Sequence, residues 1–285
     1  MFPAATPAAN GGEMLPELEI DFPGAQRRLT VLLRILLLIP QFIILFALGL
    51  GATLVSIIGW FAALVLGRLP QWVAEFLTGV LAYNTRVMAY YQLLVDRYSP
   101  VAFSAPAYPV RVFVQPGRLN RLAVLFRLLL LIPAAIISSV LSYGWLVCAF
   151  FCWLAVLILG RTPRPLCEAT AAVLRYSMRY QAYFWMLTSA YPKHVFGDEE
   201  SAPGYGGQPA PDAASTAAGY GPGGPAAIST RPLVLSRGGR WLLIVFIVVG
   251  ALALTARVAN DVQSVGGANQ LSSVSTDIST IQPPS

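Results

Sequence analysis

The sequence predicts an all-α integral membrane protein. Its predicted parts are a tandem repeat of an apolar helical hairpin plus an amphipathic interfacial helix, and then one C-terminal transmembrane helix. Of the 285 residues, 56% are hydrophobic and only 11% are charged, whereas soluble domains contain about a quarter charged residues. Two stretches of 33 residues each, 35–67 and 128–160, contain no charged residue. A third, shorter apolar run spans residues 241–256.

A duplication accounts for the two long apolar runs. When residues 23–103 are placed on 116–196, a shift of 93, the segments align without a gap and 33 of 81 pairs are identical. The identities include prolines, arginines and tyrosines in register, which leucine-rich composition alone does not produce. The chain therefore contains two copies of one unit, which we place at residues 17–103 (membrane repeat 1) and 108–197 (membrane repeat 2).

The motifs of the repeats resemble a known family. The second copy reads YPVRVFVQPGRLNRLAVLFRLLLLIP, then W-x6-GR-x-P, then a helix rich in Tyr and Arg that closes on YP. This pattern is similar to that of the bacterial membrane proteins with the domain of unknown function 4389. The first copy departs from it at both ends, with LPELEIDFPG in place of the Tyr-Pro-Val start and with YSP at its close. The resemblance implies architecture and membership and brings no activity.

Each copy begins with an extended entry and ends with an amphipathic helix. The alternation in residues 18–23 and 110–116 favours strands, and the two strands are expected to form a small two-stranded sheet. After the apolar run, Gly-Arg-x-Pro ends one helix and starts the next. The last helix, of about 25 residues closing at Tyr98 or Tyr191, has one apolar side and is expected to lie along the membrane surface or to pack on its neighbours there.

The distribution of charge favours a hairpin in each apolar run. Eighteen of the nineteen Lys and Arg residues precede Trp241 and flank both runs on both sides. Single crossings would place many of them outside, against the positive-inside rule. Hairpins turning near Gly49–Gly51 and Ser142–Gly144 keep all eighteen inside. The alternative, one kinked crossing in each run, stays open.

The remaining segments complete the predicted topology. Residues 1–16 are expected to be a disordered cytoplasmic tail and 198–236 a disordered linker rich in Gly, Pro and Ala. Residues 237–257 are the predicted transmembrane helix and 258–285 a disordered tail. Five crossings of a bacterial inner membrane follow, with the N-terminus cytoplasmic and the C-terminus extracytoplasmic.

Charged residues that recur in both copies are the candidate site residues. Six arginines near the ends of the apolar runs are expected to hold anionic lipid headgroups, with a pore or substrate role as the alternative for Arg34 and Arg127, which stand near the starts of the runs. These six are Arg28, Arg34, Arg68, Arg121, Arg127 and Arg161. A second group forms an expected ion-pair stripe on the amphipathic helices: Glu75, Arg86, Glu168 and Arg179.

The sequence offers little for catalysis. The three cysteines (Cys148, Cys152 and Cys167) are expected to be buried small hydrophobes, and His194 is the single histidine. We predict no cofactor, no metal site and no enzyme. Membrane lipids, chiefly anionic ones, and a membrane or cytoplasmic protein are the expected partners, and nucleic acid is not. A scaffold, accessory or lipid-organising component is the favoured function, and a small transporter or channel is the alternative.

Overall fold

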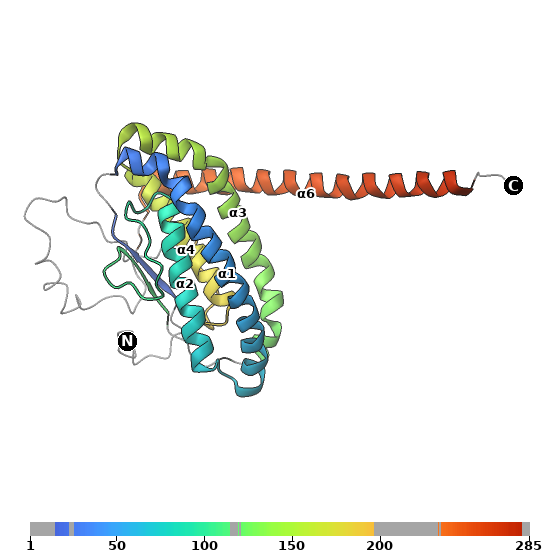
Figure 1. Cartoon of the computed structure of the whole chain (residues 1–285), viewed down its shortest axis with the longest axis horizontal. Helices are drawn as coiled ribbons and strands as arrows, with labels where there is room; N and C mark the ends of the chain where they lie inside the picture. Colours follow the sequence, from blue (N-terminus) through green and yellow to red (C-terminus); the bar gives the residue numbers. More distant parts are fainter. Residues whose placement is uncertain are drawn as a thin grey trace, which may run out of the picture.

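The computed structural model describes residues 15–22, 26–114, 119, 121–196, 233 and 235–280 of the chain. This part is mostly helical (Figure 1). Its elements are β1 (Glu17–Ile20), α1 (Arg28–Leu66), α2 (Gln71–Tyr91), β2 (Val110–Phe113), α3 (Arg121–Leu159), α4 (Arg164–Phe184) and α6 (Arg237–Thr280). Predictions for residues 1–14 and for most of the linker, 197–232 and 234, fall outside the described residues.

Each apolar run forms one continuous helix, so the predicted hairpins are wrong. α1 and α3 have 39 residues each, and neither turns near Gly49–Gly51 or Ser142–Gly144. A glycine inside a helix costs only about 1 kcal/mol. Opening the chain at these points would instead leave backbone N–H and C=O groups without partners in an apolar layer, which costs several kcal/mol for each group.

The two long helices end in the same way, with a glycine as the C-terminal cap. Gly67 follows α1 in the left-handed conformation at φ 69°, and Gly160 follows α3 at φ 69°. Each glycine returns its N–H to the carbonyl four residues earlier, on Ala63 or Val156. Glycine adopts this conformation without the steric cost that a Cβ would bring, so Gly-Arg-x-Pro stops the first helix and starts the second as predicted.

The second helix of each repeat is shorter than predicted. α2 and α4 have 21 residues each and stop seven residues before Tyr98 and Tyr191. Leu93 and Met186, at equivalent positions, take left-handed φ values of 64° and 59°. The next residue then donates its N–H to the carbonyl five residues back, which closes the last helical turn.

The two repeats are related by an approximate two-fold axis. The N–H of Gln26, just before α1, donates to the carbonyl of Gly160 after α3, and the N–H of Leu119 donates to the carbonyl of Gly67, each at 3.0 Å. Residues 26 and 119, like 67 and 160, are 93 apart, so the two bonds are copies of each other. They place the start of each long helix beside the end of the other, and α1 and α3 are therefore antiparallel.

The predicted two-stranded sheet is confirmed and obeys the same symmetry. β1 and β2 pair antiparallel, with Glu17 opposite Phe113 and Ile20 opposite Val110. A shift of 93 residues converts one of these pairs into the other. One axis therefore relates the strands within the sheet as well as the long helices.

Three layers stack along this axis. The sheet contacts α2 and α4, these contact α1 and α3, and α1 contacts α3. In Figure 1 the sheet lies on one side of α2 and α4, and the long helices lie on the other. The main hydrophobic core sits in the middle layer, where much of α2 and α4 is buried. They are interior helices, not surface ones.

α6 crosses the layers steeply and leaves on the side of α1 and α3 (Figure 1). It begins against α4 and then crosses α3 near Gly144. It continues as helix to Thr280, where an unstructured tail was predicted. No proline stands between Pro232 and Pro283 to stop it.

Candidate functional site

Arg34 and Arg127 are buried, which corrects their predicted place at the lipid headgroups. Their exposed fractions are 2% and 3%. Arg34 Nη1 donates to the carbonyl oxygen of Tyr90 at 2.6 Å, and Arg127 Nη1 to that of Tyr183 at 2.8 Å. Each guanidinium also lies over the ring of the same tyrosine, 4.4 and 4.2 Å from its centroid. A cation here donates to a carbonyl that has no partner within the helix, and it also interacts favourably with the negative, C-terminal end of the helix dipole.

The surroundings of the two arginines differ between the repeats. Arg34 Nη2 lies 3.3 Å from a carboxylate oxygen of Asp96 and 3.4 Å from Oε1 of Gln26. Ninety-three residues later these positions hold Ser189 and Leu119. Arg127 Nη2 donates to the carbonyl of Thr188 at 2.8 Å. The repeats therefore keep the helix-end contact and vary what surrounds it.

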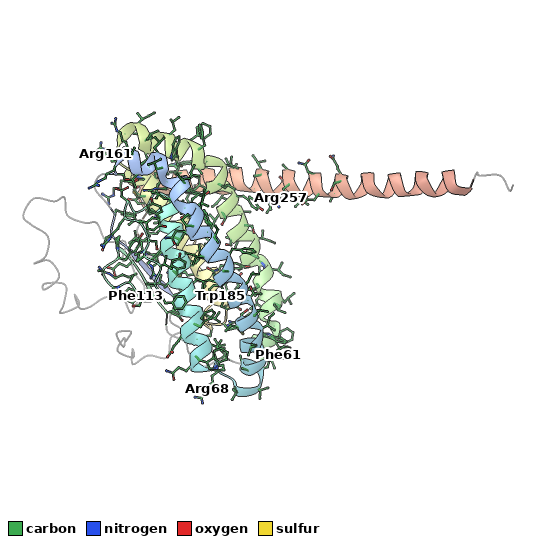
Figure 2. All side chains as sticks on the ribbon, viewed as in Figure 1. Phe61, Arg68, Phe113, Arg161, Trp185 and Arg257 are labelled. Atoms are coloured by element: carbon green, nitrogen blue, oxygen red, sulfur yellow. The ribbon has the colours of Figure 1, made fainter. Side chains whose placement is uncertain are left out.

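The other predicted headgroup anchors lie at the two ends of the bundle. Arg28, Arg68 and Arg161 are exposed, and Figure 2 shows Arg68 and Arg161 at opposite ends. Arg28 reaches the carbonyl of Ile158 at 3.2 Å, so it stands at the end that Arg161 marks. The side chain of Arg121 is outside the described part. Because Arg28, Arg68 and Arg161 are exposed, their side chains are accessible to lipid headgroups.

The residues of the predicted ion-pair stripe bond to several other groups. Glu75 accepts from Gln71 within its own helix, and Arg86 donates to the backbone carbonyls of Ala102 and Phe103. In repeat 2, Arg179 donates to the carbonyls of Pro16 and Lys193.

Glu168 has a role that its equivalent, Glu75, lacks. It is buried, and it accepts from Arg164 Nε at 2.9 Å and from the backbone N–H of Ser236 at 2.7 Å. Ser236 immediately precedes α6, so Glu168 holds the start of that helix.

In repeat 2, α6 packs closely against α3. A Cβ at Gly144 would overlap the carbonyl oxygen of Phe246, and one at Gly250 would overlap that of Val140, so the two helices touch backbone to backbone. In repeat 1 the space beside the equivalent residue, Gly51, is occupied by the ring of Phe76. The residue equivalent to Phe76 is alanine in repeat 2. The single helix α6 therefore docks on only one of two nearly equivalent repeats.

The layer of α1 and α3 exposes large apolar side chains along its length. Leu29, Phe46 and Val65 are 68%, 70% and 73% exposed on α1, and Leu122 and Phe151 are 66% and 69% exposed on α3. Exposed apolar patches beyond a few hundred Å² mark a membrane or protein contact. Three described helices are long and apolar enough to cross a membrane, over residues 28–66, 122–159 and 237–264.

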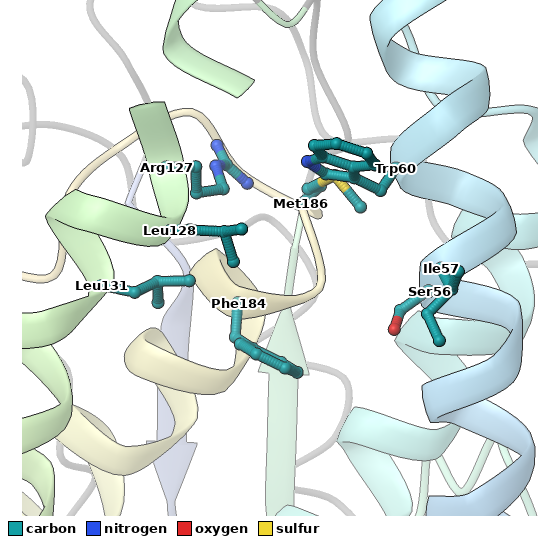
Figure 3. Close-up of a pocket in the computed structure, with 8 residues that line it drawn as sticks. All are labelled: Ser56, Ile57, Trp60, Arg127, Leu128, Leu131, Phe184 and Met186. Atoms are coloured by element: carbon teal, nitrogen blue, oxygen red, sulfur yellow. The ribbon is translucent and has the colours of Figure 1, made fainter. Parts of the chain in front are cut away.

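A cavity of about 220 Å³ opens between the two repeats (Figure 3). Its lining residues are Ser56, Ile57, Trp60, Arg127, Leu128, Leu131, Phe184 and Met186. Figure 3 shows Trp60 of α1 and Arg127 of α3 pointing toward one another, with Met186 beside them. The indole Nε1 of Trp60 is buried and has no hydrogen-bond partner among the described residues. The equivalent Trp153 Nε1 donates to the carbonyl of Val31 at 2.9 Å.

The cysteines behave as small buried groups. Cys152 and Cys167 are buried and Cys148 is half-buried, and all three thiols are free. In the described ranges no group of three or more His, Cys, Asp or Glu side chains is placed to hold a metal ion.

Two features of these sites escaped sequence reasoning. The cavity depends on a difference between repeats whose aligned residues, Trp60 and Trp153, are identical. The docking of α6 has one trace in the sequence, because the large Phe76 of repeat 1 aligns with the small Ala169 of repeat 2 at the crossing. This difference can be interpreted only once α6 is known to lie there.

The match to a family model agrees with the repeats. The model of the domain of unknown function DUF4389 matches residues 28–104 and 121–195. These segments cover the helical part of each repeat and exclude both strands. No curated protein and no solved structure matches the chain. The match spans more than half of the chain in two segments, and the chain therefore belongs to the DUF4389 family, with two tandem copies of the domain.

Proposed function

We propose that this chain is a non-enzymatic, lipid-organising scaffold of the cell membrane. In this proposal α1 and α3 lie parallel to the bilayer within its cytoplasmic leaflet, and α6 is the single crossing helix. The observation that carries the proposal is that one broad apolar layer and a projecting apolar helix share one side of the fold.

The approximate two-fold axis supports the parallel orientation. Both repeats carry arginines at the ends of their long helices, and α1 and α3 are antiparallel. If both helices crossed the membrane, the ends marked by Arg68 and Arg161 would face opposite compartments, each of them basic. If the layers lie parallel to the membrane, the axis runs along the membrane normal and both repeats keep one orientation. All the flanking arginines then stay inside, as the positive-inside rule favours.

Helix length points the same way. A helix of 39 residues is about 58 Å long, whereas the hydrocarbon core is about 30 Å thick. A crossing helix of that length needs a steep tilt or long apolar ends outside the bilayer. A helix in the membrane plane has no such mismatch, and it can bury apolar side chains along its whole length.

The path of α6 supports an assignment of the inner and outer sides. Its first residues pack on α4, the residues near Phe246 and Gly250 cross α3, and its remainder projects beyond the apolar layer. The apolar run 241–256 then enters the membrane from the cytoplasmic side, and Arg257, which donates to the hydroxyl of Tyr143 on α3, follows it. The C-terminus is extracytoplasmic, and the membrane is the inner membrane of a bacterium.

The arrangement suits organisation of lipids. Two long apolar helices occupy space in the cytoplasmic leaflet, while exposed arginines at their ends meet anionic headgroups, each worth about 1 kcal/mol near the surface. The sheet side faces the cytoplasm, where we place the contact with a protein partner. Organisation of lipids in this way requires no catalytic residue.

Labelling of single cysteines tests the orientation. In a cysteine-free background, Arg68→Cys and Arg161→Cys should both react with an impermeant maleimide in inside-out vesicles and resist it in intact cells. Ser264→Cys, on the projecting part of α6, should react in intact cells. Reaction of positions 68 and 161 from opposite sides would instead establish crossing by α1 and α3 and would defeat the parallel arrangement.

A transporter or channel is the second candidate. The cavity between two antiparallel repeats favours it, because inverted repeats often enclose a pathway. Proteoliposomes of the pure protein that move a solute or an ion would support this candidate and count against the scaffold.

A further inference from the structure

We propose that the chain forms a homodimer in the membrane, in which α6 packs in parallel against the α6 of a second copy. The contact uses the open side of α6, opposite the side that α3 and α4 cover. This inference goes beyond the proposed function and shares with it only the premise that α6 crosses the membrane.

The exposed apolar side chains of α6 follow one heptad repeat, written abcdefg. With Trp241 at position d, every large apolar side chain that is exposed in residues 237–264 falls at a, d or g. These are Trp241, Ile244, Val245, Val248, Leu252, Val258 and Val262. The residues buried against the bundle fall at b or f, and they are Gly239, Leu243, Phe246 and Gly250. One side of α6 is therefore packed on its own chain, and the other presents a coiled-coil seam more than three heptads long.

This open side continues past the apolar run that enters the membrane. After Arg257, four of the residues 258–264 are polar: Asn260, Asp261, Gln263 and Ser264. Such a segment is too polar for the hydrocarbon core, where an aspartate alone costs about 3 kcal/mol. Val258 and Val262 are nevertheless 54% and 66% exposed there. Lipid tails do not cover them in that position, whereas a protein partner removes them from water.

The helix also extends further than its own composition supports. Of the 23 residues 258–280, 18 are Gly, Ser, Thr, Asn, Asp, Val or Ile, all of which form helix less readily than Ala, Leu or Gln. Helical stability then has to come from packing. Among the described elements α6 contacts only α3 and α4, and Figure 1 shows its last part projecting with no other described element beside it. A second helix alongside supplies the packing.

The charge pattern favours a second copy as that partner. In coiled coils, charged residues at e and g select the partner. Between Trp241 and Val265, positions a, d, e and g of α6 contain no charged residue, so two copies bring no like charges together. Arg257 falls at f and donates to the hydroxyl of Tyr143 on its own α3. Copies in one bilayer share one orientation, which makes the two α6 helices parallel.

Disulfide cross-linking of single cysteines tests the pairing. In a cysteine-free background, Val248→Cys, Leu252→Cys and Val262→Cys place the thiol at a or d, and oxidation of native membranes should give a dimer band on a non-reducing gel. The matched controls are Leu254→Cys and Asp261→Cys, at position c of the same helix. Each seam variant should form at least about tenfold more dimer than the controls, because a and d residues of a parallel pair face their own copies.

A charge introduced into the seam tests the association without oxidation. Val262→Glu places two carboxylates opposite each other beyond the apolar run and should weaken the dimer by at least about tenfold, measured by light scattering of the full chain in non-ionic detergent. Asn260→Glu adds the same charge at position b and should leave the mass of the dimer unchanged. Both variants should unfold at the same temperature, which separates loss of pairing from loss of the fold.

Three results would overturn the dimer. They are equal cross-linking at position c and in the seam, the mass of a single chain at every concentration, and cross-linking of Val262→Cys to a different protein. None of these depends on how α1 and α3 lie. A dimer whose positions 68 and 161 react from opposite sides would keep the pairing and defeat the parallel arrangement. The expected maleimide labelling without cross-links would leave the scaffold as a monomer.

Discussion

The guanidinium of Arg34 closes the end of a helix in its own repeat, through the carbonyl oxygen of Tyr90 at 2.6 Å. Fifty-six residues separate donor and acceptor, and the same separation recurs in repeat 2. An arginine that the sequence places at the start of an apolar run thus serves as the cap of the following helix. The contact ties the lipid-facing layer to the buried one.

Loss of this cap should destabilise the protein strongly. Arg34→Met removes hydrogen bonds to a charged donor and leaves a buried carbonyl and Asp96 without that cation, so we expect a loss of about 2–4 kcal/mol. Arg28→Met, at an exposed position on the same helix, should change stability by less than about 0.5 kcal/mol. Denaturant unfolding in non-ionic detergent, followed by tryptophan fluorescence, measures both. Similar small losses in the two variants would contradict the capping role.

Glu168 and Glu75 offer a second matched pair. Glu168→Gln should cost about 1–2 kcal/mol, because the buried carboxylate accepts from Arg164 and from the N–H of Ser236 at the start of α6. Glu75→Gln should cost almost nothing, since Glu75 is exposed and is bonded to Gln71. Thermal unfolding of both variants, side by side in one detergent, provides the comparison. Equal shifts would show that Glu168 does not hold α6.

The crossing of α6 over α3 depends on small residues. Gly144→Ala would force a Cβ onto the carbonyl of Phe246, and overpacking of this kind costs about 1–3 kcal/mol when the backbone must move. At the equivalent Gly51 a Cβ would meet Phe76 at 3.7 Å, an ordinary contact, so Gly51→Ala should be neutral or mildly stabilising.

Hydrogen exchange separates local undocking from general loss of stability at this crossing. Gly144→Ala should speed exchange in residues 237–250 of α6 and leave α2 unchanged. Unaltered exchange in α6 would show that the helix does not depend on this close approach.

Repetition was the most informative feature of the sequence. The 93-residue shift predicted two copies of one unit, the Gly-Arg-x-Pro breaks predicted the ends of α1 and α3, and residue alternation predicted the strand pair. The hairpins were wrong because each apolar run forms one continuous helix, and charges near the ends of a run do not reveal whether the run turns in its middle. With Arg68 and Arg161 at opposite ends of a layer, the flanking arginines can share one side with no crossing by either run. Arg34 and Arg127 were misplaced because their acceptors, the carbonyls of Tyr90 and Tyr183, are backbone groups that carry no signal in the side-chain pattern.

Cys167 should be unreactive while the protein is folded. Burial raises the pKa of its thiol to about 12, with a smaller contribution from the adjacent Glu168. At pH 8 only roughly one molecule in 10⁴ then carries the reactive thiolate, against a substantial fraction for an ordinary cysteine of pKa about 8.5. In a variant with Cys148→Ala and Cys152→Ala, maleimide should label Cys167 only after unfolding in SDS. Gln71→Cys, exposed at the start of α2, should react within minutes in the same cysteine-poor background once Cys167 is also replaced by alanine. Rapid labelling of Cys167 in the folded protein at pH 8 would mean that the packing of α4 near the start of α6 is looser than its burial indicates.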